Sequence, residues 1–166
     1  MVVEREHMRI AKITLNGYSN YGNILQSYAL QQTLLKIADH VDTIWHDADN
    51  FMPRVWWKWS WKQPIKFILN WNGFRTQIKN GHIGREMVRQ YRIKQFCDKH
   101  MSIRTNICSL KELDMEYDYF IAGSDQVWNY RFIDLNVAFL SFCRKEKRLS
   151  YAASLCTPVI PEPVKR

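Results

Sequence analysis

The first 45 residues switch between two hydrophobic patterns. Residues 9–15 are mostly apolar and β-branched, which is typical of a buried strand in a parallel sheet. Apolar residues then recur at helical spacing over residues 24–38, and Asn20 or Asn23 suits the N-cap position. The apolar face of this helix is predicted to comprise Ile24, Leu25, Tyr28, Ala29, Gln32 and Leu35, with Leu30, Leu34 and Ile37 beside it. Residues 41–45 indicate a second strand, so the pattern predicts a βαβ unit with parallel strands and a right-handed crossover.

The middle of the chain breaks this pattern and is rich in tryptophan. Residues 64–70 and 84–97 have helical spacing, and the second helix is the stronger prediction because its apolar residues lie three and four positions apart. We interpret residues 54–104 as a helical insertion placed on the sheet, not as a part of it.

Strand and helix signals return in the last third of the chain. Ser109 and Glu112 have capping-box spacing and predict a short helix over residues 109–113. A further strand is expected from about residue 118, and residues 149–154, which are mostly small, predict another. Residues 132–143 are apolar without a clear period, so a helix and a loop both remain open there.

These elements predict an α/β fold, a Rossmann-like parallel sheet flanked by helices. A chain of 166 residues suits one such domain. We expect it to span residues 8–156, after a disordered leader at residues 1–7 and before a Pro-rich tail at residues 157–166. Because the chain stops straight after a strand, without a helix to cover it, we also expect a truncated domain that is poorly soluble or self-associates.

The positive charge is concentrated in one region. The formal net charge is +8, whereas residues 54–104 hold twelve Lys and Arg against only two acids, Glu86 and Asp98. The four cysteines show neither a Cys-x-x-Cys pair nor a histidine at zinc-finger spacing, which favours reduced, mostly buried thiols in a cytosolic protein. No apolar run approaches the ~18 residues of a membrane span. The five histidines are scattered, and we expect no metal.

Two stretches place small and polar residues in the loops that follow predicted strands. One is residues 20–23 (Asn-Tyr-Gly-Asn), and the other is residues 123–126 (Gly-Ser-Asp-Gln). Open α/β sheets bind ligands beyond the carboxyl ends of their strands, so both stretches could line one site. The alternative for the first stretch is a turn with a helix cap, and for the second a turn in which Ser124 or Asp125 caps the next helix. Trp128 would stack on a sugar ring or fill the core.

Other motifs in the sequence bear on whether the protein binds a nucleotide or a polyanion. Neither Gly-x-Gly-x-x-Gly nor a Walker motif is present, which disfavours a dinucleotide or P-loop function, and we expect no cofactor. The tryptophans of residues 56–61, with Lys58 and Lys62, are similar to a base-stacking platform or a membrane-interface anchor. An amphipathic helix that packs its indoles onto the sheet is the simpler interpretation.

Three stretches in register resemble the polysaccharide pyruvyl transferase family. They are residues 20–30 (NYGNILQSYAL), 118–129 (DYFIAGSDQVWN) and 150–154 (SYAAS), and residues 91–100 (YRIKQFCDKH) look like the basic helix of the family. The resemblance implies the N-terminal half of a GT-B-like architecture, in which two Rossmann-like halves face a cleft. It also implies transfer of the enolpyruvyl-derived group of phosphoenolpyruvate onto two sugar hydroxyls as a ketal, for exopolysaccharide biosynthesis.

The chain departs from the family by ending where the family continues. The groups that grip phosphoenolpyruvate are therefore expected elsewhere, the chain is expected to be a fragment that is inactive alone, and its catalytic residues stay unknown. What remains should be the acceptor wall of the cleft. The substrate-binding candidates in that wall are Asn20, Tyr21, Gly22, Asn23, Gly123, Ser124, Asp125, Gln126, Trp128 and Ser154.

Two rival functions stay open from the sequence. One is a glycosyltransferase of GT-B-like fold, and the other is a non-enzymatic module that binds a polyanion or glycan through the basic region. The expected partners are a glycan or lipid-linked saccharide acceptor and phosphoenolpyruvate, with no nucleic acid. We expect a cytoplasmic protein that contacts the inner face of the membrane peripherally.

Overall fold

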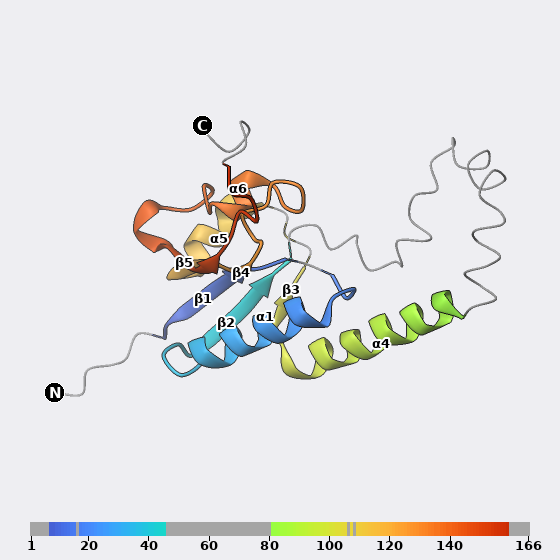
Figure 1. The fold of residues 1–166 in the computed structure, drawn as a ribbon. Coiled ribbons are helices and arrows are strands. Elements are labelled where there is room, and N and C mark those ends of the chain that lie inside the picture. The colour runs from blue at the N-terminus through green and yellow to red at the C-terminus, as the bar shows by residue number, and fades with distance from the viewer. Residues whose placement is uncertain (1–6, 16, 46–80, 106, 108, 160–166) are drawn as a thin grey trace.

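The computed structural model describes residues 7–15, 17–45, 81–105, 107 and 109–159. Within them, five parallel strands form one sheet in the order β3-β2-β1-β4-β5. Helices α1 and α4 lie on one face of this sheet, and α5 and α6 lie on the other (Figure 1). The predicted α/β fold with a Rossmann-like parallel sheet is confirmed.

The N-terminal βαβ unit forms as its hydrophobic pattern predicted. It consists of β1 (Arg9–Ile13), α1 (Tyr21–Leu34) and β2 (His40–Ile44). The buried face of α1 differs from the prediction, because Leu25 is 53% exposed whereas Ser27 is buried. The residues of α1 that are buried are Ile24, Ser27, Leu30, Gln31 and Leu34.

A layer of polar contacts between α1 and the sheet explains this difference. The Lys12 side chain of β1 is fully buried, and its Nζ donates to the hydroxyl (2.8 Å) and the carbonyl of Ser27. Ser27 Oγ also lies 3.3 Å from Thr14 Oγ1, and Thr43 Oγ1 of β2 donates to Gln31 Oε1 at 3.4 Å. The two buried polar residues of α1, Ser27 and Gln31, therefore satisfy polar groups that the strands bury. Burial lowers the pKa of Lys12 to about 7.

A second crossover extends the sheet from β2. The long helix α4 (His82–His100) leads to β3 (Ile103–Arg104), which pairs in parallel with β2 through Thr43 opposite Ile103. Residues 82–104 therefore form a helix that packs on the sheet and a strand that belongs to it. This differs from the interpretation of residues 54–104 as an insertion outside the sheet. A strand of two residues is too short to show a period of its own. The helix predicted at residues 64–70 and the tryptophan cluster lie outside the described residues.

The remaining elements cover the other face and add the last two strands. They are α5 (Leu110–Glu116), β4 (Tyr119–Asp125), α6 (Leu135–Ala138), the 3-10 helix η2 (Lys145–Lys147) and β5 (Arg148–Ala153). Ser109 is the N-cap of α5, but its side chain makes no capping hydrogen bond. Residues 132–143, for which helix and loop were both open, form the single turn of α6 among further turns.

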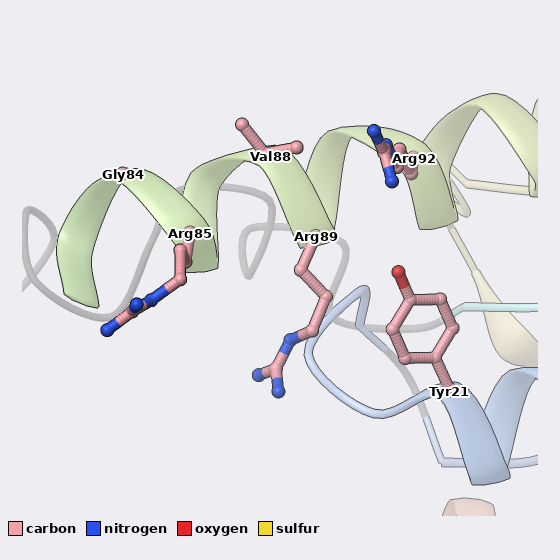
Figure 2. A pocket seen from close by; sticks show the side chains of 6 residues that line it. All are labelled: Tyr21, Gly84, Arg85, Val88, Arg89 and Arg92. Carbon is pink, nitrogen blue, oxygen red and sulfur yellow. The ribbon is translucent and has the colours of Figure 1, made fainter. Parts of the chain in front are cut away.

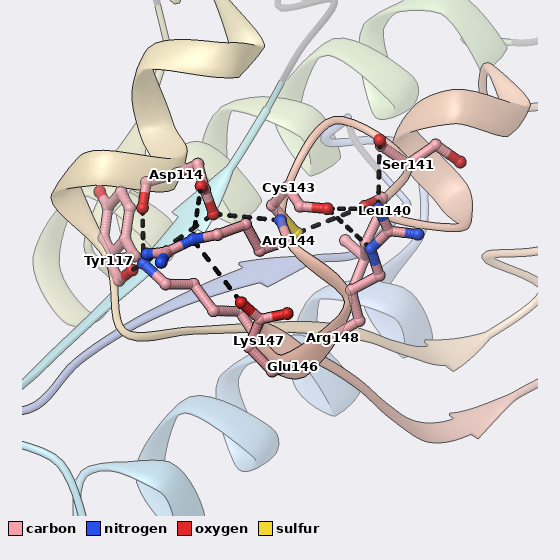
Figure 3. A network of polar contacts seen from close by, with 9 residues as sticks. All are labelled: Asp114, Tyr117, Leu140, Ser141, Cys143, Arg144, Glu146, Lys147 and Arg148. Atoms are coloured by element: carbon pink, nitrogen blue, oxygen red, sulfur yellow. Dashed lines mark hydrogen bonds and ion pairs between the residues drawn. The ribbon is translucent and has the colours of Figure 1, made fainter.

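Polar contacts with α5 set the position of β5 (Figure 3). Lys147 Nζ donates to the carbonyls of Asp114 (2.6 Å) and Tyr117 (2.7 Å), which lie at the C-terminal end of α5. Arg144 Nε lies 3.0 Å from Asp114 Oδ2. Cationic side chains at a helix C-terminus donate hydrogen bonds to its last carbonyls and interact favourably with the negative end of its dipole. The start of β5 is thereby fixed, although Tyr151 in the middle of this edge strand is 60% exposed.

A buried carboxylate ties β2 to α5. Asp42 Oδ2 accepts from the Tyr117 hydroxyl at 2.6 Å and lies 3.0 Å from His40 Nε2, and Asp42 Oδ1 accepts from Ser102 at 2.5 Å. Burial acts to raise the pKa of Asp42, but the hydrogen bonds from Ser102 and Tyr117 outweigh it and hold the pKa below its usual value. This network fixes the crossover that leads from β3 to β4.

Removal of the Tyr117 hydroxyl should weaken the network measurably. We expect Tyr117→Phe to lower the free energy of unfolding by about 1–2 kcal/mol, because the buried Asp42 carboxylate loses a charge-assisted hydrogen bond. Urea unfolding followed by circular dichroism measures this. Tyr119→Phe, at a partly exposed position nearby, is the matched control and should change the free energy by less than about 0.5 kcal/mol. Equal effects of the two changes would contradict a special role of this hydroxyl.

Candidate functional site

The sheet reverses its winding between β1 and β4. The chain leads from β1 to β2 and β3 on one side and from β4 to β5 on the other. β1 and β4 are neighbours in parallel, with Ile13 opposite Ala122, so the loops that follow them leave the same edge of the sheet. This is the topological switch point, where open α/β sheets bind their ligands. The two predicted stretches, residues 20–23 and 123–126, lie at this one edge.

The first stretch forms the start of α1. Asn20 is the N-cap, and its Oδ1 accepts from the backbone N–H of Gly22 at 2.8 Å. The turn-with-cap alternative therefore describes Asn20. Tyr21 begins the helix and is 46% exposed, while Asn23 is half-buried in the first turn. The stretch thus presents the positive end of the α1 dipole, with the Tyr21 ring beside it, at the switch point.

The second stretch is the end of β4, held close to β5. Gly123 has φ +157°, and a Cβ there would lie 2.0 Å from the carbonyl oxygen of Tyr151. Asp125 is in the left-handed region with φ 64°. The next helix, α6, is capped by Asp134, so the alternative in which Ser124 or Asp125 caps it is wrong. Gly123 therefore allows a close backbone approach, while Ser124 and Asp125 are left half-buried at the carboxyl edge.

Ser154 joins the end of β5 to this loop. Its backbone N–H donates to the Asp125 carbonyl at 2.9 Å, and its carbonyl accepts from the Trp128 N–H at 3.3 Å. The Trp128 ring stacks on Phe139 with centroids 5.6 Å apart, and its Nε1 donates to the Ala138 carbonyl at 3.2 Å. The indole is thus held by a ring contact and a hydrogen bond to the protein's own residues, as in the core-filling alternative.

Gln126 completes the turn after β4. Its Oε1 accepts from Asn129 Nδ2 at 3.3 Å, and the Asn129 N–H donates to the Gln126 carbonyl at 2.9 Å. Among the ten candidates, backbone hydrogen bonds therefore bring Asp125, Trp128 and Ser154 together around one loop, which also contains Gln126.

Beside this edge lies a basic pocket, which was not predicted from the sequence as a site. The N-terminal half of α4 projects beyond the start of α1 (Figure 1). A pocket of about 410 Å³ lies between these two helices. Its lining residues are Tyr21, Gly84, Arg85, Val88, Arg89 and Arg92 (Figure 2). The signal was present in the sequence as arginines at i, i+4 and i+7, which share one side of a helix.

The described part of the chain contains neither a buried thiol with a lowered pKa nor a group of metal-ligating side chains. Burial raises the pKa of the Cys97 thiol to about 11 and also raises the pKa of Cys143, which is the opposite of activation. In that same part, no three His, Cys, Asp or Glu side chains are grouped to hold a metal ion. Nor does it contain a helix long and apolar enough to cross a membrane.

The sheet order and the switch-point loops define a Rossmann-like α/β protein. A family model described as polysaccharide pyruvyl transferase matches residues 20–166, and the chain belongs to this family. The matched residues include both stretches at the switch point, so the resemblance found in the sequence is confirmed. Searches of curated proteins and of solved structures found no match.

Proposed function

We propose that the chain acts in the transfer of a pyruvyl group from phosphoenolpyruvate to two hydroxyls of one sugar in a surface or exopolysaccharide. The observation that carries the proposal is the family match over residues 20–166, which includes both loops of the switch point. The neutral polar groups and single carboxylate at this edge suit hydrogen bonds to sugar hydroxyls. The edge is accordingly assigned to the acceptor.

The chemistry needs one addition and one substitution, and the proton of the first hydroxyl balances the proton that the methylene carbon takes up. The methylene carbon of phosphoenolpyruvate takes a proton while one sugar oxygen bonds to the adjacent carbon. The second sugar oxygen then bonds to that same carbon, its carbon–oxygen bond to phosphate breaks, and inorganic phosphate leaves with the second hydroxyl proton. The product is a ketal whose free carboxylate adds one negative charge to the glycan.

Asp125 is the residue of the edge whose side chain we assign to the acceptor. Its left-handed backbone is one that Asp and Asn adopt more readily than other residues with a Cβ. Asp125→Asn therefore removes the charge and keeps an acceptor oxygen without straining the backbone. The reaction belongs to the cytoplasmic side of the membrane, where a lipid-linked saccharide is the acceptor.

The function can be tested in the source cell. Deletion of the coding sequence should remove the pyruvyl ketal methyl signal from the proton NMR spectrum of the surface polysaccharide. A shortened or differently composed glycan would instead indicate a glycosyltransferase, and an unchanged covalent structure would indicate a binding module.

Variants returned to the deleted cell test the acceptor edge. We expect Asp125→Asn to restore less than about a tenth of the ketal, since loss of one charged hydrogen bond costs about 1.5–3 kcal/mol. Glu146→Gln removes an exposed carboxylate just before the start of β5 and should restore the full ketal content. Ketal content per repeat, normalised to the amount of protein, is the measurement. Full restoration by Asp125→Asn would contradict the assignment of this residue.

A further inference from the structure

We propose that the N-terminal half of α4 lies on the surface of an anionic lipid bilayer, with the side chains of Met87, Val88 and Tyr91 against the lipid. Together these three residues form the outer face of α4. The contact is independent of the proposed function, because no reacting group takes part in it.

The outer face is apolar and exposed to solvent. Met87 is 53%, Val88 52% and Tyr91 61% exposed. Their spacing of i, i+1 and i+4 places them on one side of the helix, whereas Ile93 and Cys97 on the other side are buried. Single exposed apolar residues are ordinary on a protein surface, but a group of them marks a contact with another protein or with a membrane.

The shape of this half of α4 favours a flat partner. It projects beyond the start of α1 (Figure 1), and Val88 points from it away from Arg89 (Figure 2). Gly84, one turn before Val88, is exposed, and a Cβ there would meet no atom within 4 Å in the described part of the chain. A projecting ridge of this kind can lie on a planar bilayer, which needs no groove to receive it.

The charge of the region selects an anionic surface. Residues 46–104, which contain α4 and the stretch before it, hold twelve Lys and Arg against four acids, whereas the rest of the chain holds twelve against twelve. Ion pairs within the chain leave this sum unchanged, since the whole chain has a formal net charge of +8 with every acid counted. Helices that lie in a membrane interface combine apolar side chains with Lys and Arg in this way. The same charge would repel a second copy of the chain.

The contact would hold the candidate site near the membrane. Both α1 and the projecting half of α4 begin at the end of the sheet where the switch-point loops lie (Figure 1). The outer face belongs to that half, so a bilayer against it lies beside this end of the sheet. Tyr91 suits such a position, because its ring can contact lipid while its hydroxyl stays in water.

Sedimentation of the full chain with lipid vesicles tests the contact without any turnover. Vesicles of phosphatidylcholine and phosphatidylglycerol should bind the chain at least tenfold more tightly than vesicles of phosphatidylcholine alone, and added salt should weaken the binding. Amide hydrogen exchange should slow in the N-terminal half of α4 when vesicles are bound and stay unchanged in α5, which lies on the other face of the sheet (Figure 1).

Two double variants separate the outer face from general stickiness. Met87→Gln/Tyr91→Gln keeps the charge and the helix propensity and should lose at least tenfold in affinity for the anionic vesicles. Met115→Gln/Tyr151→Gln makes the same two exchanges in α5 and β5, at residues that are 85% and 60% exposed, and should retain the affinity. All four residues are more than half exposed, so urea unfolding should be the same for both variants.

Three results would overturn the proposal. The first is no binding to the anionic vesicles. The second is an equal loss in both double variants, or no loss in Met87→Gln/Tyr91→Gln, since either would assign the binding to residues outside this face. The third is a dimer in analytical ultracentrifugation that Met87→Gln/Tyr91→Gln abolishes, without vesicle binding, which would make the face a subunit interface.

The vesicle measurements and the ketal measurement fail independently. Loss of the ketal on deletion, together with no vesicle binding, would leave the proposed function intact and remove only this inference. Vesicle binding through the outer face, with an unchanged ketal content on deletion, would do the reverse.

Discussion

Gly123→Ala is expected to lower the free energy of unfolding by about 4 kcal/mol, the largest effect of any single change considered. A Cβ at this position would lie 2.0 Å from the Tyr151 carbonyl oxygen and 2.9 Å from its carbonyl carbon. Both atoms are backbone atoms of the paired strand, so no side chain can move to relieve the contact. β4 and β5 must separate locally, with loss of the ladder that pairs Gly123 with Tyr151.

Gly84→Ala is the matched control for this change. Gly84 lies in α4, and a Cβ there would meet no atom within 4 Å. The same added methyl group should stabilise the protein by about 0.5 kcal/mol, because alanine favours a helix more than glycine does. Urea unfolding of both variants measures the two effects. A loss of less than about 1 kcal/mol for Gly123→Ala would contradict the close approach of β4 and β5.

Lys12→Met is expected to stabilise the protein by about 2 kcal/mol near pH 7. Burial lowers the pKa of Lys12 from 10.5 to about 7, so its ammonium form costs free energy in the folded state. Replacement of a buried charge by an apolar side chain of similar length is commonly neutral or stabilising. The Ser27 hydroxyl keeps its contact with Thr14 after the change, so this group is not left without a partner.

The pH dependence of stability provides a second test at the same residue. Between pH 7 and 10.5 the unfolded chain binds more protons at Lys12 than the folded chain, so the free energy of unfolding rises with pH. Cys97, the thiol that interacts with Lys12, has its pKa raised to about 11, which lowers stability only above its unfolded value near 9. The clean window is therefore pH 7–9, over which Lys12 should contribute an increase of about 2–3 kcal/mol.

The Lys12→Met variant should lose this increase, because it has no group to titrate there. Lys36→Met, which removes an exposed lysine just after α1, is the matched control and should keep the slope of the original protein. Chemical unfolding at several pH values between 7 and 9 gives the slopes. Identical slopes for the original protein and Lys12→Met would show that the buried ammonium is not the cause.

The strands and main helices could be predicted because their hydrophobic patterns are long and local. β1, β2 and β5 each fall within two residues of the predicted limits, whereas β4 runs on to Asp125, three residues past its predicted end; α4 was predicted from its apolar spacing. β3 was missed because two residues carry no pattern. The prediction of the buried face of α1 was wrong, because Ser27 and Gln31 are buried by hydrogen bonds to side chains of the strands and not by their hydrophobicity.

The candidate site could be predicted only in part. Its location at one edge followed from the order of strands and loops, and the structure places both stretches there. The individual contacts depend on distant residues: the need for Gly123 comes from Tyr151, and the packing of Trp128 comes from Phe139. The arginine pocket depends on how far α4 projects past α1, which helical spacing alone does not determine.

The position of β1 between β2 and β4 has a consequence for how the protein folds. The β1–β2 pairing joins residues about 31 positions apart, as in the contact of Met8 with Asp39, whereas the β1–β4 pairing joins residues 109 apart, as in the contact of Arg9 with Asp118. The longer closure costs about 1 kcal/mol more chain entropy. The switch-point edge at β1 and β4 is thus formed by the more remote pairing, so partial unfolding should separate β1 from β4 while the first βαβ unit persists.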